Sequence, residues 1–154
     1  MNRVFAYGSN LDPQRLKLRA PSWDGTFKRA RLPQRELRFN KRSLKYGVAA
    51  NIFPHRHRSV WGIVIELNRE DLAAIDRCEG YPIHYDRLST QLFLDDRREI
   101  SAYVYRANAE FILEGKTPSS DYLDYVVRGA QACSLPEDYI RAIARLGKTE
   151  SSVK

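Results

Sequence analysis

The pattern of apolar and polar residues predicts that strands make up the middle of the chain and helices its ends. The clearest strand covers residues 59–67, where Val60, Ile63 and Ile65 belong to a nearly continuous apolar run typical of a buried strand. Other strands are predicted at residues 3–7, 23–39 (one bent strand or a pair, interrupted at Pro33), 46–53 (ended by Pro54), 85–94 and 99–105. The last two are predicted to form a hairpin around the charged turn at residues 95–98.

Four helices are predicted from capping residues and from apolar residues at helical spacing. They are expected at residues 12–19, 68–78, from Ser119 onward, and from Pro136 to about Leu146. Asp12, Asn68 and Ser119 are suitable N-terminal caps, and Gly80 is predicted to end the second helix. Residues 40–45 are expected to form a polar, basic loop, and residues 107–117 a connector with a short helical turn.

Strands in the middle of the chain with helices beside them indicate an α+β fold with a mixed sheet. Strands and helices alternate too sparsely for a doubly wound parallel sheet. A chain of 154 residues is expected to form one domain, here residues 1–147, and residues 148–154 are expected to be a polar tail. No repeat or internal linker interrupts this domain.

The chain is basic, with a net charge of +7, and much of this charge lies in one segment. That segment contains Lys28, Arg29, Arg31, Arg35, Arg38, Lys41, Arg42 and Lys45. It lacks the context of a known nucleic-acid-binding motif, so we interpret it as the solvated, charged edge of a strand. A secondary hypothesis is that its positive field attracts anionic substrates.

The remaining composition argues against several kinds of site. Two distant cysteines, Cys78 and Cys133, indicate reduced thiols and a cytoplasmic protein. No apolar run approaches membrane-spanning length, and the N-terminus lacks the apolar core of a signal peptide. His55 and His57 form a close pair, but the arginines beside them would repel a metal ion, so no metal site is expected.

The most informative stretch is Tyr7-Gly8-Ser9-Asn10, which joins the first predicted strand to the first predicted helix. Gly8 can adopt a positive φ, and the side chains of Ser9 and Asn10 can bond to their own backbone, so all three suit a tight turn. A tight turn before a helix presents unpaired N–H groups on one side. The turn is therefore a candidate cradle for an anion or a carbonyl oxygen.

This stretch resembles the signature loop of the γ-glutamylcyclotransferase family, which includes the AIG2-like proteins. Other segments resemble the same family in the same order along nearly the whole chain, residues 4–146. They are Gly47-Val48-Ala49-Ala50-Asn51-Ile52, Val60-Trp61-Gly62-Ile63-Val64, Cys78-Glu79-Gly80-Tyr81, Tyr85, Pro118-Ser119-Ser120-Asp121-Tyr122, Gly129-Ala130 and Leu135-Pro136. The resemblance implies that the sheet closes into a barrel with helices packed outside.

The family reaction is the attack of the α-amine of a γ-glutamyl group on its own γ-carbonyl, which releases an amine and forms 5-oxoproline. The resemblance implies Glu79 as the general acid/base and Tyr7, Gly8, Ser9 and Asn10 as the loop that binds the glutamyl group. It also implies that Tyr85 and Tyr122 line the substrate pocket. Neither a metal nor an organic cofactor is required. Glu79 lies at the C-terminal end of a helix, where the dipole disfavours a carboxylate, so a buried Glu79 would have a raised pKa.

Several alternatives remain open at this stage. Glu79 could instead form a structural ion pair with Arg77 or Arg87. The tyrosines could be half-buried core residues. Tyr85 lies closer to Glu79 in the sequence than the corresponding tyrosine does in the animal enzymes. Tyr81 therefore remains an alternative to Tyr85 as the residue that lines the pocket.

The function also has alternatives, namely a cyclotransferase for γ-glutamylamines or another γ-glutamyl metabolite, or a non-catalytic AIG2-like binding protein. The partner expected is a small γ-glutamyl molecule, with no membrane and no nucleic acid. The leaving group, the pathway and the oligomeric state, a homodimer included, are not determined by the sequence.

Overall fold

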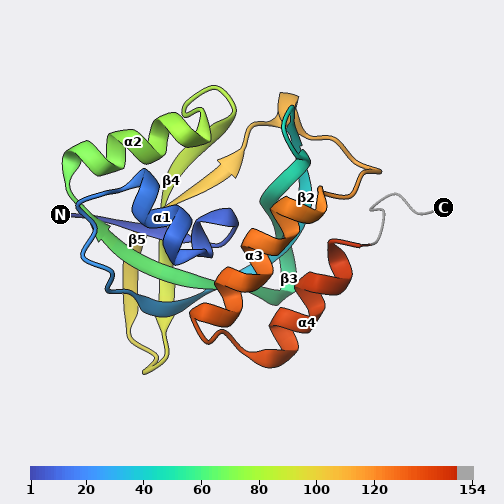
Figure 1. Cartoon of the computed structure of the whole chain (residues 1–154). Helices are drawn as coiled ribbons and strands as arrows, with labels where there is room; N and C mark the ends of the chain where they lie inside the picture. Colours follow the sequence, from blue (N-terminus) through green and yellow to red (C-terminus); the bar gives the residue numbers. More distant parts are fainter. Residues whose placement is uncertain (149–154) are drawn as a thin grey trace.

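A computed structural model describes residues 1–148, so the predicted tail lies, apart from Lys148, outside the described residues. Five strands form a closed barrel in the order β1–β3–β2–β4–β5 (Figure 1). All neighbouring strands are antiparallel except β1 and β5, which pair in parallel at Val4 and Tyr103. The mixed, barrel-like sheet of the predicted α+β fold is therefore confirmed. The strands are β1 (Asn2–Ala6), β2 (Lys28–Ser43), β3 (Gly47–Leu67), β4 (Tyr85–Leu94) and β5 (Glu99–Ala107).

Helices pack around this barrel (Figure 1). Their bounds are α1 (Pro13–Arg19), α2 (Arg69–Glu79), α3 (Ser120–Ala132) and α4 (Glu137–Leu146), with single 3-10 turns η1 (Ser9–Leu11) and η2 (Ala109–Phe111). The predicted caps are confirmed, because Asp12, Asn68 and Ser119 each accept a hydrogen bond from a backbone N–H of the first turn. In the described part of the chain, no helix is long and apolar enough to span a membrane.

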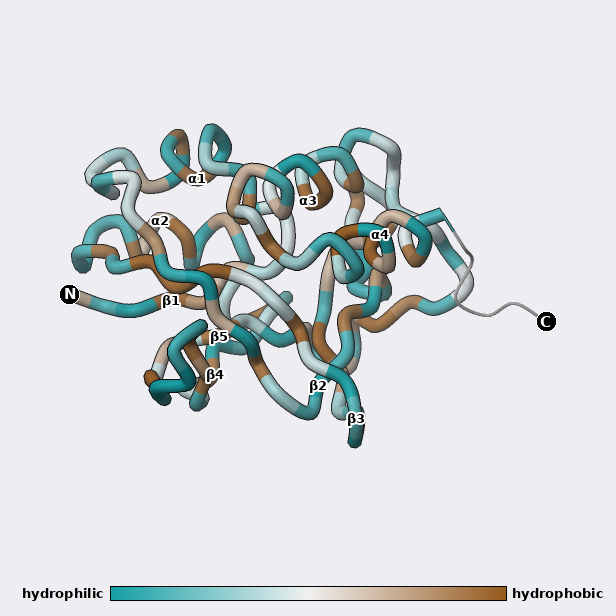
Figure 2. Tube along the Cα trace, turned by 90° about the horizontal axis from the view of Figure 1, so that it is seen from below, coloured by the Kyte–Doolittle hydropathy of each residue, from teal (hydrophilic) through white to brown (hydrophobic). Residues whose placement is uncertain are grey.

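Buried side chains from every strand and from the helices form one hydrophobic core. Figure 2 shows hydrophobic and hydrophilic stretches alternating along the strands and helices, as expected for elements with one buried and one exposed face. Helix α3 lies directly on the η1 turn. A Cβ atom at Gly129 would lie 2.4 Å from the backbone carbon of Leu11, so only glycine permits this close approach. The packing of α3 thus fixes the position of the loop that follows β1.

The two predicted interruptions at proline are wrong, since β2 continues through Pro33 and β3 through Pro54. Pro33 pairs with Ser59, whereas Arg35 pairs with Pro54, so residues 55–58 of β3 lie opposite the single residue Gln34. A proline lacks the N–H that a regular ladder needs, and a bulge is one of the places where a strand tolerates it. The register shift therefore lets β2 and β3 continue through Pro33 and Pro54, although a proline in the sequence suggests the end of a strand.

The loop predicted at residues 40–45 is also wrong, because β2 runs on to Ser43. A second register shift, between Phe39 and Lys41, turns both Asn40 and Lys41 inward, with 0% and 8% of each residue exposed. Asn40 accepts a hydrogen bond from the Asn51 side chain (3.2 Å). The basic segment is therefore solvated only in part, since Lys41 is buried.

Candidate active site

One cavity of about 320 Å³ lies between the β1–η1 loop, the C-terminal end of α2 and the strands β2 and β3. Its volume falls within the range of small-molecule sites, roughly 300–1,000 Å³. All seven site residues expected from the sequence line it: Glu79, Tyr7, Gly8, Ser9, Asn10, Tyr85 and Tyr122. The fold thus brings together residues that are up to 115 positions apart, as counted from Tyr7 to Tyr122.

The loop after β1 forms one wall of the cavity. Its η1 turn is closed by hydrogen bonds from the amides of Leu11 to Gly8 O (3.0 Å) and of Asp12 to Ser9 O (3.2 Å). Within the described residues, the amides of Gly8, Ser9 and Asn10 donate to no protein acceptor, as expected for the start of a helical turn. Three N–H groups are therefore available at the cavity wall for a carbonyl oxygen or an anion.

Gly8 is needed in this loop for space rather than for a positive φ. Its φ is −111°, so the positive φ considered from the sequence is wrong. A Cβ atom on Gly8 would lie 3.1 Å from the Cβ of Ala50 and 3.3 Å from the hydroxyl of Tyr122. A larger side chain would push the loop away from β3 and α3, and with it the three N–H groups.

The tyrosine hydroxyls hold the inner walls of the cavity in place. Tyr85 donates to the carbonyl of Ala50 (2.6 Å), and Tyr122 accepts from the amide of the same residue (2.9 Å). Tyr7 donates to the carbonyl of Tyr105 (2.5 Å). Burial raises the pKa of Tyr122 to about 12, so its hydroxyl is protonated at neutral pH. The proton of Tyr122 is not used in the bond to Ala50 and can be donated into the cavity.

The alternative pocket residue Tyr81 lies elsewhere. The guanidinium of Arg87 lies over its ring, 4.7 Å from the centroid, and Tyr81 is not part of the cavity lining. Of the two candidates kept open by the sequence, Tyr85 is therefore the one at the cavity.

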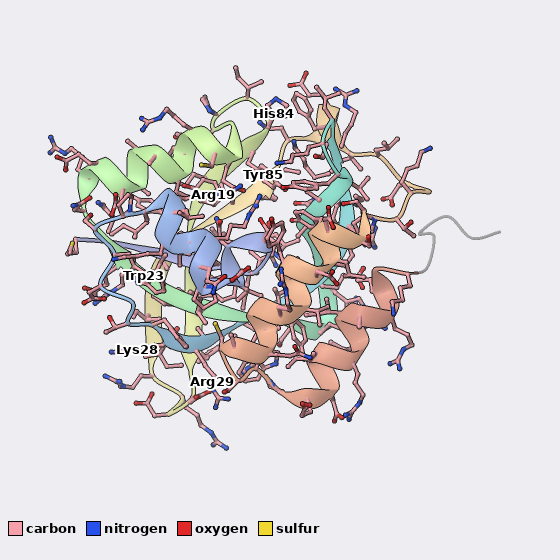
Figure 3. All side chains as sticks on the ribbon, viewed as in Figure 1. Arg19, Trp23, Lys28, Arg29, His84 and Tyr85 are labelled. Atoms are coloured by element: carbon pink, nitrogen blue, oxygen red, sulfur yellow. The ribbon has the colours of Figure 1, made fainter. Side chains whose placement is uncertain are left out.

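Glu79 is the last residue of α2, and Gly80 ends the helix with a φ of 68°, as predicted. The Glu79 side chain is 18% exposed, and its carboxylate lies 3.7 Å from the guanidinium of Arg19. The alternative of an ion pair with Arg77 or Arg87 is wrong, since Glu79 pairs with Arg19 and Arg87 pairs with Asp76. In the view of Figure 3, the labelled Arg19 and Tyr85, which both line the cavity, lie further from the edge of the molecule than His84.

The environment of Glu79 favours its protonated form more than water does. Burial raises the pKa of its carboxyl above the ordinary value of 4.5. Nearby cations and a hydrogen bond from Asn10 act in the opposite direction without cancelling this effect; the cations are Arg19, Lys41 and Arg15. A carboxyl with a raised pKa is a stronger base when ionised than an ordinary carboxylate, which suits proton transfer.

Sequence reasoning missed the cations around Glu79. Arg15 and Arg19 are four residues apart on α1, so they share one helix face, and this spacing could have identified them. Arg15 donates to the hydroxyl of Tyr46 (3.1 Å) and lies over the ring of Tyr125. No sequence pattern could have identified Lys41, because a lysine in a basic segment is expected to be exposed to solvent.

The described residues contain no group of three or more His, Cys, Asp and Glu side chains arranged to hold a metal ion. The cavity itself supplies several groups suited to acid–base chemistry and to binding anions. They provide one carboxyl for proton transfer, backbone N–H donors and a phenol for developing negative charge, and cations for anionic substrate groups.

Comparisons with known proteins show the family of this chain. Residues 59–143 match the AIG2-like family, which is more than half of the chain. The chain is 32% identical to the human γ-glutamylcyclotransferase over 141 residues, covering 88% of this chain and 73% of the human one. It is 31% identical to the bovine γ-glutamylcyclotransferase with the same coverage.

A solved structure of a γ-glutamyl cyclotransferase superposes on this fold with a TM-score of 0.86 and 28% sequence identity. The match covers 99% of this chain and 92% of the other. Sequence and structure thus agree over nearly the full length, and the chain belongs to the AIG2-like γ-glutamylcyclotransferase family of enzymes.

Proposed function

We propose that this enzyme converts a γ-glutamyl amino acid to 5-oxoproline and a free amino acid, with Glu79 as the general acid/base. The α-nitrogen of the glutamyl group attacks the γ-carbonyl carbon and forms the lactam C–N bond. The C–N bond to the amino acid then breaks. Glu79 takes one proton from the ammonium before the attack and a second from the same nitrogen after the C–N bond has formed. It passes both in turn to the leaving nitrogen, which departs as an ammonium, so no external reactant is consumed.

In this proposal the loop from Tyr7 to Asn10 holds the folded glutamyl group. Its free N–H groups stabilise the negative charge that develops on the γ-carbonyl oxygen, because preorganised donors need no reorientation during the reaction. Tyr122 adds a neutral hydroxyl donor. Ring closure already joins nucleophile and carbonyl in one molecule, so the protein mainly has to select the folded conformer.

One observation carries the proposal: a carboxyl with a raised pKa and three unpaired N–H groups line the same cavity. The Asn10 side chain and Glu79 are linked through Arg19, whose guanidinium donates to Asn10 Oδ1 (2.8 Å) and lies 3.7 Å from the Glu79 carboxylate. Base and donors can therefore contact one bound molecule. The family membership supports the choice of a γ-glutamyl group as that molecule.

The test is 5-oxoproline release from γ-glutamyl dipeptides and glutathione by the parent enzyme and by Glu79→Gln. Positioned proton transfer contributes about 10²–10⁴-fold in rate, so the Gln variant should lose at least about 10²-fold. Glu70→Gln is the matched control, because Glu70 is exposed on the first turn of the same helix. A folded Gln variant that works at the parent rate would refute the role of Glu79.

A further inference from the structure

Lys41 is a buried cation in the cavity wall that forms no ion pair within the described part of the chain. Only 8% of the residue is exposed. Its ammonium lies 3.0 Å from Nδ1 of His84 and over the rings of Tyr85 (5.4 Å) and Phe111 (5.5 Å). A buried charge is costly unless an opposite charge or several hydrogen bonds compensate it. One histidine and two ring faces compensate the buried charge of Lys41 only partly. An ammonium group in this position is suited to binding an anion.

His84 completes this arrangement as a fixed neutral partner. Its ring stacks on Phe111 with centroids 4.2 Å apart. Burial lowers its pKa below 6.5, and the neighbouring cations Lys41 and Arg42 lower it further, so His84 is neutral at pH 7. Neutral His84 accepts from Lys41 at Nδ1 and therefore carries its proton on Nε2. The pair thus offers N–H donors of the ammonium and the imidazole.

His84 lies on the open side of the cavity, since it is half-exposed. Its partner Lys41 is buried, but the residue that follows it, Arg42, is exposed. The inner walls consist of buried groups, among them Tyr7 and Tyr122. Figure 3 likewise shows His84 further out than Tyr85 and Arg19. A departing product must leave through the open side, so this side suits the leaving group.

The cavity has more than one cation for the carboxylates of a substrate. Arg19 from α1 lies 3.7 Å from Glu79, whereas Lys41 from β2 and Arg15 from α1 interact with Glu79 electrostatically without forming an ion pair with it in the described residues. A γ-glutamyl amino acid has one carboxylate on its glutamyl part and a second on the leaving amino acid. A γ-glutamylamine lacks the second. Only the first kind of substrate therefore brings a second negative charge that Lys41 and His84 can bind.

We propose that Lys41 and His84 bind the carboxylate of the leaving amino acid and so make the enzyme selective for γ-glutamyl amino acids over γ-glutamylamines. This inference rests on the proposed function, because it assumes that the glutamyl part lies between the loop and Glu79. It assigns Lys41 to substrate selection, whereas its sequence neighbours Arg38 and Arg42 form part of the outer surface.

The experiment compares γ-glutamyl-alanine with γ-glutamyl-alanine amide, which lacks the second negative charge but keeps the shape. A hydrogen bond to a charged group contributes about 1.5–3 kcal/mol, or about 10–100-fold. Lys41→Met should therefore lose about 10–100-fold in kcat/KM for the acid, mostly through KM, and less than about threefold for the amide. Lys41→Arg should retain part of the preference, and Lys28→Met is the matched control because Lys28 is exposed on the same strand.

The possible results separate this inference from the proposed function. Equal losses on both substrates would show that Lys41 acts on Glu79 or on the glutamyl part, and would overturn the selectivity role. An unchanged Lys41→Met variant, or a parent enzyme that prefers the amide, would overturn it too. A parent that releases 5-oxoproline from neither substrate would refute the proposed function, and this inference with it.

Discussion

The two ends of α2 each place a carboxylate in a largely buried position, but the two environments are opposite. Asp71, at the N-terminal end, is 6% exposed and accepts hydrogen bonds from the backbone amide of Ser22 (3.0 Å) and from its hydroxyl. Its own amide donates to the cap Asn68, which also donates to the hydroxyl of Ser22 (2.8 Å). The helix dipole favours a negative charge at this end.

Glu79, at the C-terminal end, lies where the same dipole disfavours a negative charge. Its nearest cation is 3.7 Å away, and burial raises its pKa. Asp71 is therefore held in place by hydrogen-bond donors that stabilise the fold. Glu79 instead lines the cavity, and its raised pKa makes it easier to protonate than an ordinary carboxylate. One helix thus has an end whose carboxylate stabilises the fold and an end whose carboxylate is less favourable for stability, and the second end is where we propose the chemistry.

The largest expected effect concerns the loop that the C-terminal end of α2 faces. Gly8→Val should reduce 5-oxoproline formation by roughly 10²–10³-fold, because the new side chain displaces the N–H donors and each such donor is worth about this much. Ser9→Ala keeps the backbone and should have a much smaller effect. Initial rates with a γ-glutamyl dipeptide and thermal unfolding of both variants check this. A Gly8→Val variant with parent activity would separate the loop from catalysis.

The next effect concerns the stabilising end. Asp71→Ala removes a buried charged acceptor that receives two hydrogen bonds from Ser22, so the free energy of unfolding should fall by about 1.5–3 kcal/mol. The kcat of the folded variant should stay near the parent value, because Asp71 does not line the cavity. Urea unfolding measures the first and steady-state kinetics the second, with Glu70→Ala as the exposed control. A loss of kcat without loss of stability would contradict the division between the two ends.

The smallest effect is a pH dependence of stability that originates at Glu79. Since its pKa is raised in the folded state, the folded protein retains a proton that the unfolded chain has already released. The free energy of unfolding of the parent should therefore fall, relative to Glu79→Gln, as the pH rises from the ordinary value of about 4.5 through the raised pKa. Urea unfolding of both proteins at several pH values tests this. If the free energy of unfolding of the parent instead rose relative to that of Glu79→Gln with rising pH, the pKa of Glu79 would be lowered in the folded state.

The sequence by itself determined the elements whose causes are local. The caps Asp12, Asn68 and Ser119 act on amides two or three residues away, and Gly80 ends α2 through its own φ. The β4–β5 hairpin and the position of Glu79 at a helix end follow from similarly short-range patterns. These features were predictable because the interacting groups are neighbours in the chain.

The tertiary structure decided what depends on contacts between distant residues. Pro33 and Pro54 look like strand ends, yet a register shift between two paired strands accommodates both. Arg19 rather than Arg77 or Arg87 pairs with Glu79, because the packing of α1 against α2 places it there. Lys41 is buried because a bulge turns it inward, although its charge predicts a solvated side chain. Register and burial are settled by the whole barrel, so local sequence cannot specify them.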